Sequence, residues 1–167
     1  WYGVRKANVN RHMKIFITGV AGFLGSHLAD LMLSQGHKVA GNDNMIGGYT
    51  DNVPQDVEFH QVDCCDLENL TKAMDGCDIV YHTAATAYEG LSVFSPVLVT
   101  RNIFEASVTT ITAAIRNKVK RIVYCSSMAR YGHHDQVPYK ETYECRPQDP
   151  YGIAKKAGED VLRNLCD

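Results

Sequence analysis

A tyrosine and a lysine near the end of the chain have the spacing and chemistry of an acid–base pair. Tyr151 and Lys155 stand four residues apart in the segment YGIAK, so a helix would place both on one face. A phenol with an ordinary pKa near ~10 is a poor base at neutral pH, but a nearby ammonium would lower that pKa. The pair could then remove a proton from a hydroxyl group and return it. An isolated pair of this spacing is also common on exposed helices, so other motifs must decide.

Three glycines near the start of the chain form a loop suited to phosphate. Gly19, Gly22 and Gly25 have the spacing G-x-x-G-x-x-G, with Phe23 and Leu24 between the last two. Glycine permits a tight turn and lets a pyrophosphate approach the backbone. The N-terminus of a following helix adds free N–H groups and a positive dipole end. The alternative is a plain strand-to-helix turn, because three glycines alone are a weak signal.

An acidic residue follows where the ribose of a dinucleotide would lie. Asp43 directly follows the next predicted strand, and Asn44 comes after it. The Asp43 carboxylate could accept hydrogen bonds from both hydroxyl groups of an adenosine ribose and would repel a 2′-phosphate. No Arg or Lys between Gly41 and Pro54 could neutralise that phosphate, so the sequence favours NAD over NADP. Alternatively, Asp43 is a solvated turn residue.

Short β-rich runs alternate with helical patterns around these motifs. The predicted strands are 15–18, 38–42, 57–60, 79–81 and 121–125, and the later predicted helices are 67–74, 104–115 and 151–165. A first helix presents Leu24, Leu28 and Leu31 on one face and ends at Gly36. The last helix is expected to have Asp149 as its N-cap and Pro150 as its first residue.

This alternation predicts an α/β fold, a Rossmann-type doubly wound parallel sheet with helices on both faces. Such sheets bind ligands beyond the carboxyl ends of their strands. Every motif falls at one of those ends, and that agreement supports a single ligand site more strongly than any one motif.

Four further segments complete a resemblance to the extended short-chain dehydrogenase/reductase family, whose members modify nucleotide sugars. They are Val62–Asp66, His82–Ala85, Cys125–Gly132 and Tyr151–Lys155. They resemble, in turn, an acidic turn that contacts adenine, a segment of small residues packed on the cofactor, the stretch with the active-site serine, and the catalytic Tyr-x-x-x-Lys pair. The resemblance runs from Met13 to the end of the chain.

The resemblance implies roles for the matching residues. Ser127, Tyr151 and Lys155 would be catalytic, with Ser127 bonded to the reacting sugar oxygen and Lys155 also holding the nicotinamide ribose. The cofactor-binding residues that it implies are Gly19, Gly22, Phe23, Leu24, Gly25, Asp43, Asn44, Asp63, Cys64, Thr83, Ala84, Ala85, Asn102, Cys125, Tyr151 and Lys155. Near Asn102 the match is partial, because Glu105 and Ala106 depart from the family pattern.

The substrate would meet Thr86, Ser127 and Tyr151. Tyr88 and Glu89 follow Thr86, and all three could equally be loop residues. Dehydratases of this family resemble one another in an acidic pair after the active-site hydroxyl residue, whereas Met128 and Ala129 stand there and cannot transfer protons. Decarboxylases usually have a Glu at the second position.

The amino-acid sequences of the serine and tyrosine segments most resemble those of nucleotide-sugar 4-epimerases. The resemblance implies a UDP-sugar substrate and transient hydride transfer to NAD. Two alternatives stay open, an NAD(P)-dependent reductase of a keto-sugar or other carbonyl compound and a catalytically silent dinucleotide-binding module. The resemblance also makes a homodimer plausible, through helices near 94–118 and 151–165.

Composition sets the remaining expectations. The chain has 167 residues and a formal net charge of -2, without a basic block or a long apolar run, so neither a nucleic-acid partner nor a membrane partner is expected. Six cysteines without a C-x-x-C pair indicate free thiols and a cytoplasmic location. His133 and His134 lack a third ligand, so no metal site is expected. Residues 1–12 are interpreted as an extension or artificial remnant, and residues 13–167 as an NAD-binding domain shorter than the family's chains.

Overall fold

Parallel strands form the centre of the computed structural model, which describes residues 12–87 and 89–166. Within those residues the strands are β1 (Lys14–Thr18), β2 (Lys38–Asn42), β3 (Glu58–His60), β4 (Ile79–His82) and β5 (Arg121–Tyr124). Their spatial order is β3-β2-β1-β4-β5, so the order reverses between β1 and β4. The predicted doubly wound parallel sheet is therefore confirmed. The predicted extension over residues 1–12 lies, except for His12, outside the described residues.

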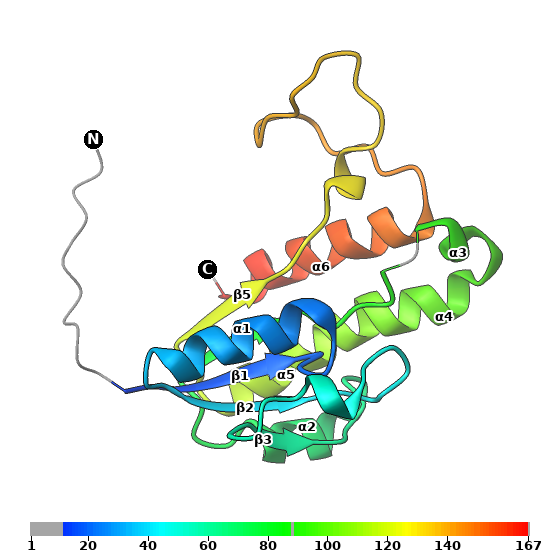
Figure 1. Ribbon diagram of the computed structural model, residues 1–167. Helices are drawn as coiled ribbons and strands as arrows, with labels where there is room; N and C mark the ends of the chain where they lie inside the picture. The colour runs from blue at the N-terminus through cyan, green and yellow to red at the C-terminus, as the bar shows by residue number, and fades with distance from the viewer. Residues whose placement is uncertain (1–11, 88, 167) are drawn as a thin grey trace, which may run out of the picture.

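Helices cover both faces of this sheet (Figure 1). They are α1 (Phe23–Ser34), α2 (Leu67–Ala73), α3 (Glu89–Phe94), α4 (Pro96–Thr100), α5 (Ala106–Arg116) and α6 (Pro150–Cys166). Helix α1 lies on one face, and α2, α5 and α6 lie on the other. The ligand edge, where β1, β2 and β4 end, is thus bounded by helices from both layers.

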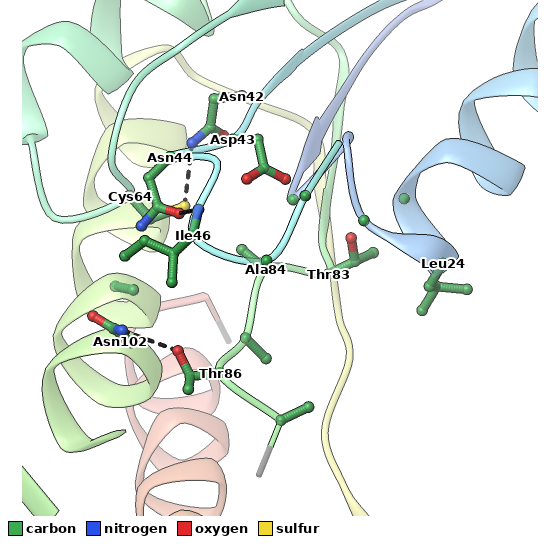
Figure 2. Close-up of a pocket in the computed structure, with 18 of the residues that line it drawn as sticks. Leu24, Asn42, Asp43, Asn44, Ile46, Cys64, Thr83, Ala84, Thr86 and Asn102 are labelled. Atoms are coloured by element: carbon green, nitrogen blue, oxygen red, sulfur yellow. Dashed lines mark hydrogen bonds between the residues drawn. The ribbon is translucent and has the colours of Figure 1, made fainter. Parts of the chain in front are cut away.

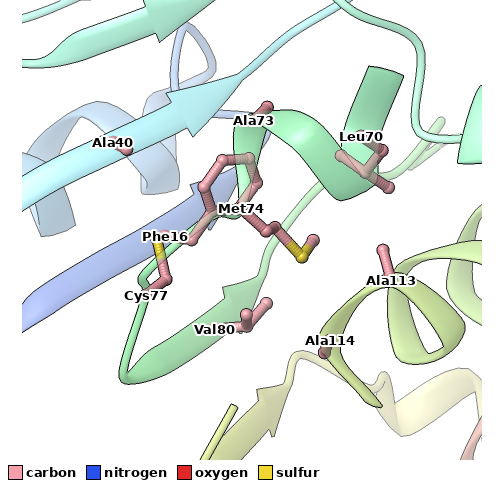
Figure 3. Close-up of a cluster of buried hydrophobic side chains, with 9 residues drawn as sticks. All are labelled: Phe16, Ala40, Leu70, Ala73, Met74, Cys77, Val80, Ala113 and Ala114. Atoms are coloured by element: carbon pink, nitrogen blue, oxygen red, sulfur yellow. The ribbon is translucent and has the colours of Figure 1, made fainter. Parts of the chain in front are cut away.

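The core beneath α2 and α5 is built from residues that alternate along the strands (Figure 3). Phe16 pairs in register with Ala40 on one side and Val80 on the other, and all three point to the same face. Ala113 and Ala114 bring α5 close to them because a methyl group occupies little space between helix and sheet. Strands buried on both faces are expected to be continuously apolar, as Ile15, Phe16 and Ile17 of β1 are.

The face of helix α1 predicted from its leucines is only partly correct, because Leu28 packs against the core and the other two leucines do not. Leu24 and Leu31 are 53% and 49% exposed, whereas Gly25, Ser26 and Ala29 are buried. The helix approaches the sheet through small residues, because the glycine loop holds its first turn directly against β1. Gly36, with φ +82°, lies just beyond the helix end as predicted.

The long helix predicted around 104–115 is not one regular helix. Helix α4 continues through a π-helical segment, Arg101–Glu105, into α5. A π turn places more residues in one turn than an α-helix does, and such turns are frequent at functional sites. The unusual residues Glu105 and Ala106 lie where the π segment ends, and Asn102 lies within it.

The last helix begins as the sequence predicted. Pro150 is the first residue of α6, and Asp149 Oδ1 accepts a hydrogen bond from the Gly152 N–H at 2.8 Å. This cap fixes the start of the helix that carries Tyr151 and Lys155. Predicted and observed strand ends differ by no more than one residue in β3, β4 and β5.

Candidate functional site

A pocket of about 410 Å³ opens at the carboxyl ends of β1, β2 and β4 (Figure 2). Most of the residues predicted to bind the cofactor line it: Gly19, Gly22, Phe23, Leu24, Gly25, Asp43, Asn44, Asp63, Cys64, Thr83, Ala84, Ala85 and Asn102. Cys125, Tyr151 and Lys155 do not line it. The pocket therefore gathers residues from five separate chain segments and leaves the acid–base pair beside it.

The glycine loop allows its surroundings to close around the pocket. A Cβ at Gly25 would lie 2.1 Å from the Gly19 carbonyl oxygen, and a Cβ at Gly19 would lie 2.8 Å from the Ala84 Cα. Gly19 also has φ +71°, in the left-handed region that favours glycine. No side chain caps α1 at Gly22, so the N–H groups of its first turn remain available for an anion.

Asp43 is fixed at the base of the pocket and is only 8% exposed. Its Oδ2 accepts from the Ala21 N–H at 3.2 Å and its Oδ1 from the Met45 N–H at 2.8 Å. A carboxylate oxygen has two acceptor sites, so each oxygen can still accept a ribose hydroxyl. The alternative interpretation as a solvated turn residue is wrong, because Asp43 is buried and tied to the glycine loop.

Asp63 forms a second acidic point at the pocket mouth. It accepts hydrogen bonds from the Cys65 N–H at 2.7 Å and from Asn44 Nδ2 at 3.1 Å, and the Arg101 guanidinium lies 3.5 Å away. Burial would raise the pKa of Asp63, but these hydrogen bonds and the Arg101 charge outweigh it and lower the pKa below its ordinary value. Asp63 is therefore an ionised acceptor at neutral pH.

On the far side of the pocket, a hydrogen bond joins two of the predicted site residues. Asn102, in the π segment, donates from Nδ2 to Thr86 Oγ1 at 2.9 Å (Figure 2). Thr86 is thus held by a helix and is more than a free loop residue. Tyr88 lies outside the described residues, and Glu89 is exposed at the start of α3.

Lys155 is buried where α6 crosses the end of β5. It is 2% exposed, and its Nζ donates to the Cys125 carbonyl oxygen at 2.7 Å. Burial lowers the pKa of Lys155 to about 8. The ammonium is therefore charged at neutral pH but loses its proton readily.

Tyr151 lies one helical turn earlier, with its ring centroid 6.0 Å from Lys155 Nζ. Burial raises its pKa above the ordinary value; the Ser127 hydroxyl opposes that shift, and Glu89 and Asp149 add to it. In the chain without ligands the net shift of the Tyr151 pKa is thus upward, because burial and two carboxylates prevail; that Lys155 and a positive nicotinamide ring together lower it stays a prediction. Tyr151 borders a second opening of about 670 Å³, and Ala87 lines both openings.

His82 connects the segment after β4 to β1 and α5 through hydrogen bonds. Burial lowers its pKa to about 3, so the ring is neutral. The Ser107 hydroxyl donates to the Ile103 carbonyl, so it accepts from His82 Nε2 at 3.1 Å. His82 Nδ1 then accepts from Thr18 Oγ1 at 2.8 Å, and Thr18 Oγ1 accepts from the Ala84 N–H at 3.1 Å. This chain of bonds fixes Ala84 at the wall of the pocket.

Sequence reasoning missed several lining residues: Asn42, Ile46, Gly47, Gly48, Ala87 and Ala106. The adjacent glycines Gly47 and Gly48 were a usable signal in the sequence. The structure shows the reason at Gly48, where a Cβ would lie 3.0 Å from Asp43 Oδ1. Asn42 gave no signal, since its place in a strand predicts only burial. Its Nδ2 donates to the Val62 carbonyl at 2.8 Å.

Within residues 12–87 and 89–166, no group of three His, Cys, Asp or Glu side chains is arranged to hold a metal ion. His134 instead packs beside Tyr139 and Tyr143. None of the helices in the described part is long and apolar enough to cross a membrane.

Comparison with known proteins gives a consistent result. Residues 15–167 match the NAD dependent epimerase/dehydratase family. A UDP-glucose 4-epimerase of Lacticaseibacillus casei is 33% identical over 152 residues, which cover 90% of this chain and 46% of that protein. UDP-arabinose 4-epimerase 1 of Arabidopsis thaliana is 31% identical over 159 residues, covering 89% of this chain and 38% of that protein.

Solved structures agree with the sequence matches. The UDP-glucose 4-epimerase of Thermotoga maritima with UDP-glucose superposes with a TM-score of 0.88 at 31% identity, covering 91% of this chain and 50% of the other. The Thermus thermophilus UDP-glucose 4-epimerase in complex with NAD gives a TM-score of 0.86 at 34% identity, with the same two coverages of 91% and 50%. The chain thus spans half or less of the length of these relatives.

Proposed function

Because the chain belongs to the NAD dependent epimerase/dehydratase family, we propose that it is the cofactor-binding half of a nucleotide-sugar 4-epimerase that uses NAD. The observation that carries this proposal is the adjacency of two openings. One is walled by the glycine loop and Asp43, and the other is bordered by Tyr151. A dinucleotide in the first would direct its reactive end toward the second.

The residues present fit NAD. Side-chain-free glycines leave room for a pyrophosphate at the N-terminus of α1, where a Cβ at Gly22 would lie only 3.2 Å from the Gly19 carbonyl oxygen. Asp43 would hold the adenosine ribose and disfavour a 2′-phosphate, and Asp63 would accept from the adenine amino group. Lys155 would hold the nicotinamide ribose. When bound, NAD would take a hydride from the sugar carbon and return it to the opposite face.

Tyr151 is the proposed proton carrier. Without ligands its raised pKa keeps the phenol protonated at neutral pH. The positive charge of an oxidised nicotinamide ring would favour the phenolate, which then removes the proton of the sugar 4-hydroxyl. Ser127 would hydrogen-bond the same sugar oxygen, and Thr86 would contact the sugar from the pocket wall.

A UDP-sugar is the proposed substrate. Two similar proteins are named as 4-epimerases of UDP-glucose and UDP-arabinose, and one similar structure contains UDP-glucose. The relatives are at least twice as long as the matched region, so we expect the 167-residue chain to bind NAD but to epimerise poorly.

The proposal is tested by mixing the NAD-saturated chain with UDP-glucose or UDP-arabinose and following the sugar H-4 signal by NMR. Formation of the 4-epimer, even slowly, without net NADH release supports it, provided that Tyr151→Phe abolishes the product. Absence of NAD binding would reject the proposal outright.

The runner-up function is a keto-sugar or carbonyl reductase. The protonated state of Tyr151 favours it, because a phenol can donate a proton to a carbonyl oxygen as hydride arrives. Stoichiometric oxidation of added NADH or NADPH by a keto-sugar, with no epimer formed, would support this function. A chain that binds NAD and catalyses neither reaction would be a silent binding module.

An exposed apolar surface supports a homodimer. On α3 and α4, Val93, Phe94 and Val97 are 64%, 86% and 83% exposed, and Ile153 on the neighbouring α6 is 54% exposed. Apolar surface of this kind is typical of protein interfaces. Light scattering should give twice the chain mass, and Val97→Asp should return the monomer. We also propose a cytoplasmic location, because all six cysteines are free thiols.

A further inference from the structure

Three ionisable side chains lie on one face of α6, on successive turns. Tyr151, Lys155 and Glu159 stand at i, i+4 and i+8, and all three are buried. The segment 125–130, which follows β5 and contains Ser127, runs along this face. The proposed mechanism uses Tyr151 and Lys155 but gives no role to Glu159, although a carboxylate that is 6% exposed is rarely tolerated without a partner.

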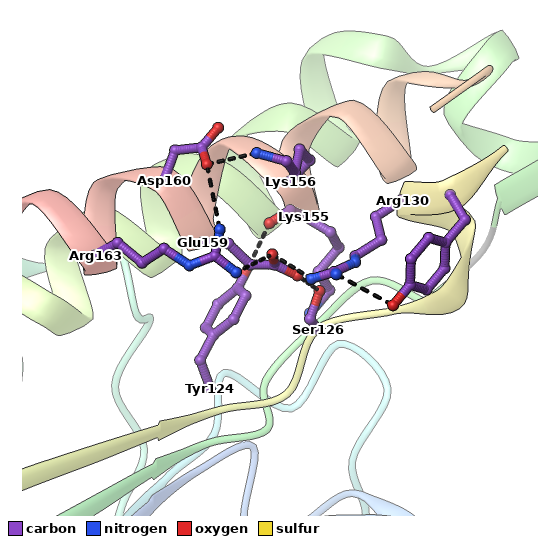
Figure 4. Close-up of polar contacts among 9 residues, drawn as sticks. Tyr124, Ser126, Arg130, Lys155, Lys156, Glu159, Asp160 and Arg163 are labelled. Carbon is purple, nitrogen blue, oxygen red and sulfur yellow. Dashed lines mark hydrogen bonds and ion pairs between the residues drawn. The ribbon is translucent and has the colours of Figure 1, made fainter. Parts of the chain in front are cut away.

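Glu159 has partners on both sides of Ser127 in the sequence. Its Oε1 accepts from the Ser126 hydroxyl, and its Oε2 accepts from Arg130 Nη1 (Figure 4). Arg163, on α6 itself, adds a longer contact of 3.4 Å. Burial would raise the pKa of Glu159, but the hydrogen bonds from Arg130 and Ser126 outweigh it, and the pKa lies below its ordinary value. Glu159 is therefore ionised at neutral pH.

Arg130 is held as firmly as its partner. Its Nη2 donates to the Tyr131 hydroxyl at 3.1 Å, and its guanidinium carbon lies 4.6 Å from the Tyr131 ring centroid. The side chain is 16% exposed. The ion pair with Glu159 is thus poorly screened by water and orders the short turn after Ser127.

The segment lies close to the helix along its length. A Cβ at Gly152 would lie 2.7 Å from the Ala129 carbonyl oxygen, and a Cβ at Gly158 would lie 2.5 Å from the Tyr124 hydroxyl. The Ser127 hydroxyl accepts from the Ala129 N–H at 3.1 Å, within its own turn. Apart from the contact between its hydroxyl and Tyr151, the placement of Ser127 against α6 comes from neighbouring residues.

We propose that Glu159 is a positioning residue. By accepting hydrogen bonds from Ser126 and Arg130, it holds the segment 125–130 against α6. Ser127 and the Cys125 carbonyl are thereby placed beside Tyr151 and Lys155. The inference rests on the proposed function for its consequence, because only a nicotinamide-end site gives that placement a use. The adenosine end of the pocket contains none of these contacts. Loss of Glu159 should therefore weaken NAD binding and leave ADP binding intact.

The test compares NAD and ADP binding by calorimetry for the 167-residue chain and three variants. We expect Glu159→Ala to lower NAD affinity about tenfold with ADP affinity unchanged. Glu159→Gln should lie between, because its amide oxygen can accept one of the two bonds while its NH₂ faces the other donor. The matched control is Asp160→Asn, the next residue, whose exposed carboxylate pairs with Lys156 on the helix surface; both affinities should stay unchanged.

Hydrogen exchange of the ligand-free chain provides a readout independent of NAD. Glu159→Ala and Arg130→Met should both speed exchange across 125–131 while β1 and α1 keep wild-type rates. Unchanged exchange there, or equal losses of NAD and ADP affinity, would overturn the proposal. Failure of the wild-type chain to bind NAD would reject the proposed function alone, because the exchange result would still decide the placement role of Glu159.

Discussion

The two ends of the site are held by different kinds of interaction. At the adenosine end, backbone groups dominate: Asp43 is fixed by the N–H groups of Ala21 and Met45, and the glycines remove side chains from the turn. At the catalytic end, side chains dominate: Lys155 reaches a carbonyl 30 residues away, and Glu159 reaches Ser126 and Arg130.

Under the proposed function, this difference separates cofactor recognition from catalysis. Backbone contacts between the glycine loop and the residues that follow β2 place the adenosine end wherever the sheet forms. The catalytic end depends on α6 meeting the β5 segment in one register, and that register is set by buried charges. Substitutions should therefore damage the two ends independently, and ADP and NAD are the ligands that distinguish them.

The largest expected effect comes from Gly25→Ala. The added Cβ would overlap the Gly19 carbonyl oxygen, 2.1 Å away, so the loop must move. Both ADP and NAD affinities should fall about 100-fold, as expected for overpacking at a fixed backbone. Calorimetry measures both, with Ser34→Ala at the exposed end of α1 as control. A loss for NAD alone would contradict the separation of the two ends.

Lys155→Met should change how stability depends on pH. Below about pH 8 folded and unfolded chains both carry the ammonium, so folding bears the full cost of burying it. Between about 8 and 10.5 the folded chain has lost the proton and the unfolded chain has not, so the cost shrinks, and above 10.5 it is gone.

The free energy of unfolding of Lys155→Met, relative to that of wild type, should therefore decrease by up to about 3 kcal/mol between pH 7 and pH 10.5. Urea denaturation at the two pH values measures this change. A difference between wild type and variant that does not vary with pH would show that burial does not depress the Lys155 pKa.

The same substitution should affect NAD affinity and ADP affinity differently at neutral pH. Lys155→Met removes the donor proposed for the nicotinamide ribose, so NAD affinity should fall about tenfold while ADP affinity is retained. Titration of both ligands checks this, with Lys156→Met, the half-buried neighbour on α6 that pairs with Asp160, as the matched control. Equal binding of NAD by wild type and Lys155→Met would place the nicotinamide elsewhere.

The smallest effect is expected from Asp43→Asn, which keeps the shape, removes the charge and replaces one acceptor oxygen with an NH₂ that faces a backbone N–H. Repulsion of a 2′-phosphate should weaken, so the ratio of NAD to NADP affinity should fall about fivefold. Asp51→Asn, in the exposed turn beyond the pocket, is the control. An unchanged ratio would mean that another group excludes NADP.

The sequence predicted what local chemistry determines. The sheet, the glycine loop, the cap at Asp149 and the position of Asp43 follow from patterns within a few residues. Leu24 and Leu31 gave a wrong prediction of which α1 residues contact the sheet. Spacing identifies an apolar face, but it does not show that small residues such as Ala29 let the helix lie closer to the sheet.

The catalytic end shows where such reasoning stops. Glu159 in an amphipathic helix predicts a solvated carboxylate, and its partners stand 29 and 33 residues away. The Tyr151 pKa depends on burial and on Glu89, which only the folded chain brings near. The π segment that carries Asn102 likewise depends on packing that no local pattern encodes.

Calorimetric titration of the wild-type chain with NAD and, separately, with NADP tests the central claim most directly. Clear NAD binding with NADP at least about tenfold weaker is the predicted result, because Asp43 would accept the ribose hydroxyls and repel the phosphate. NADP binding as tight as NAD, or tighter, would contradict the assignment of Asp43 and favour the reductase.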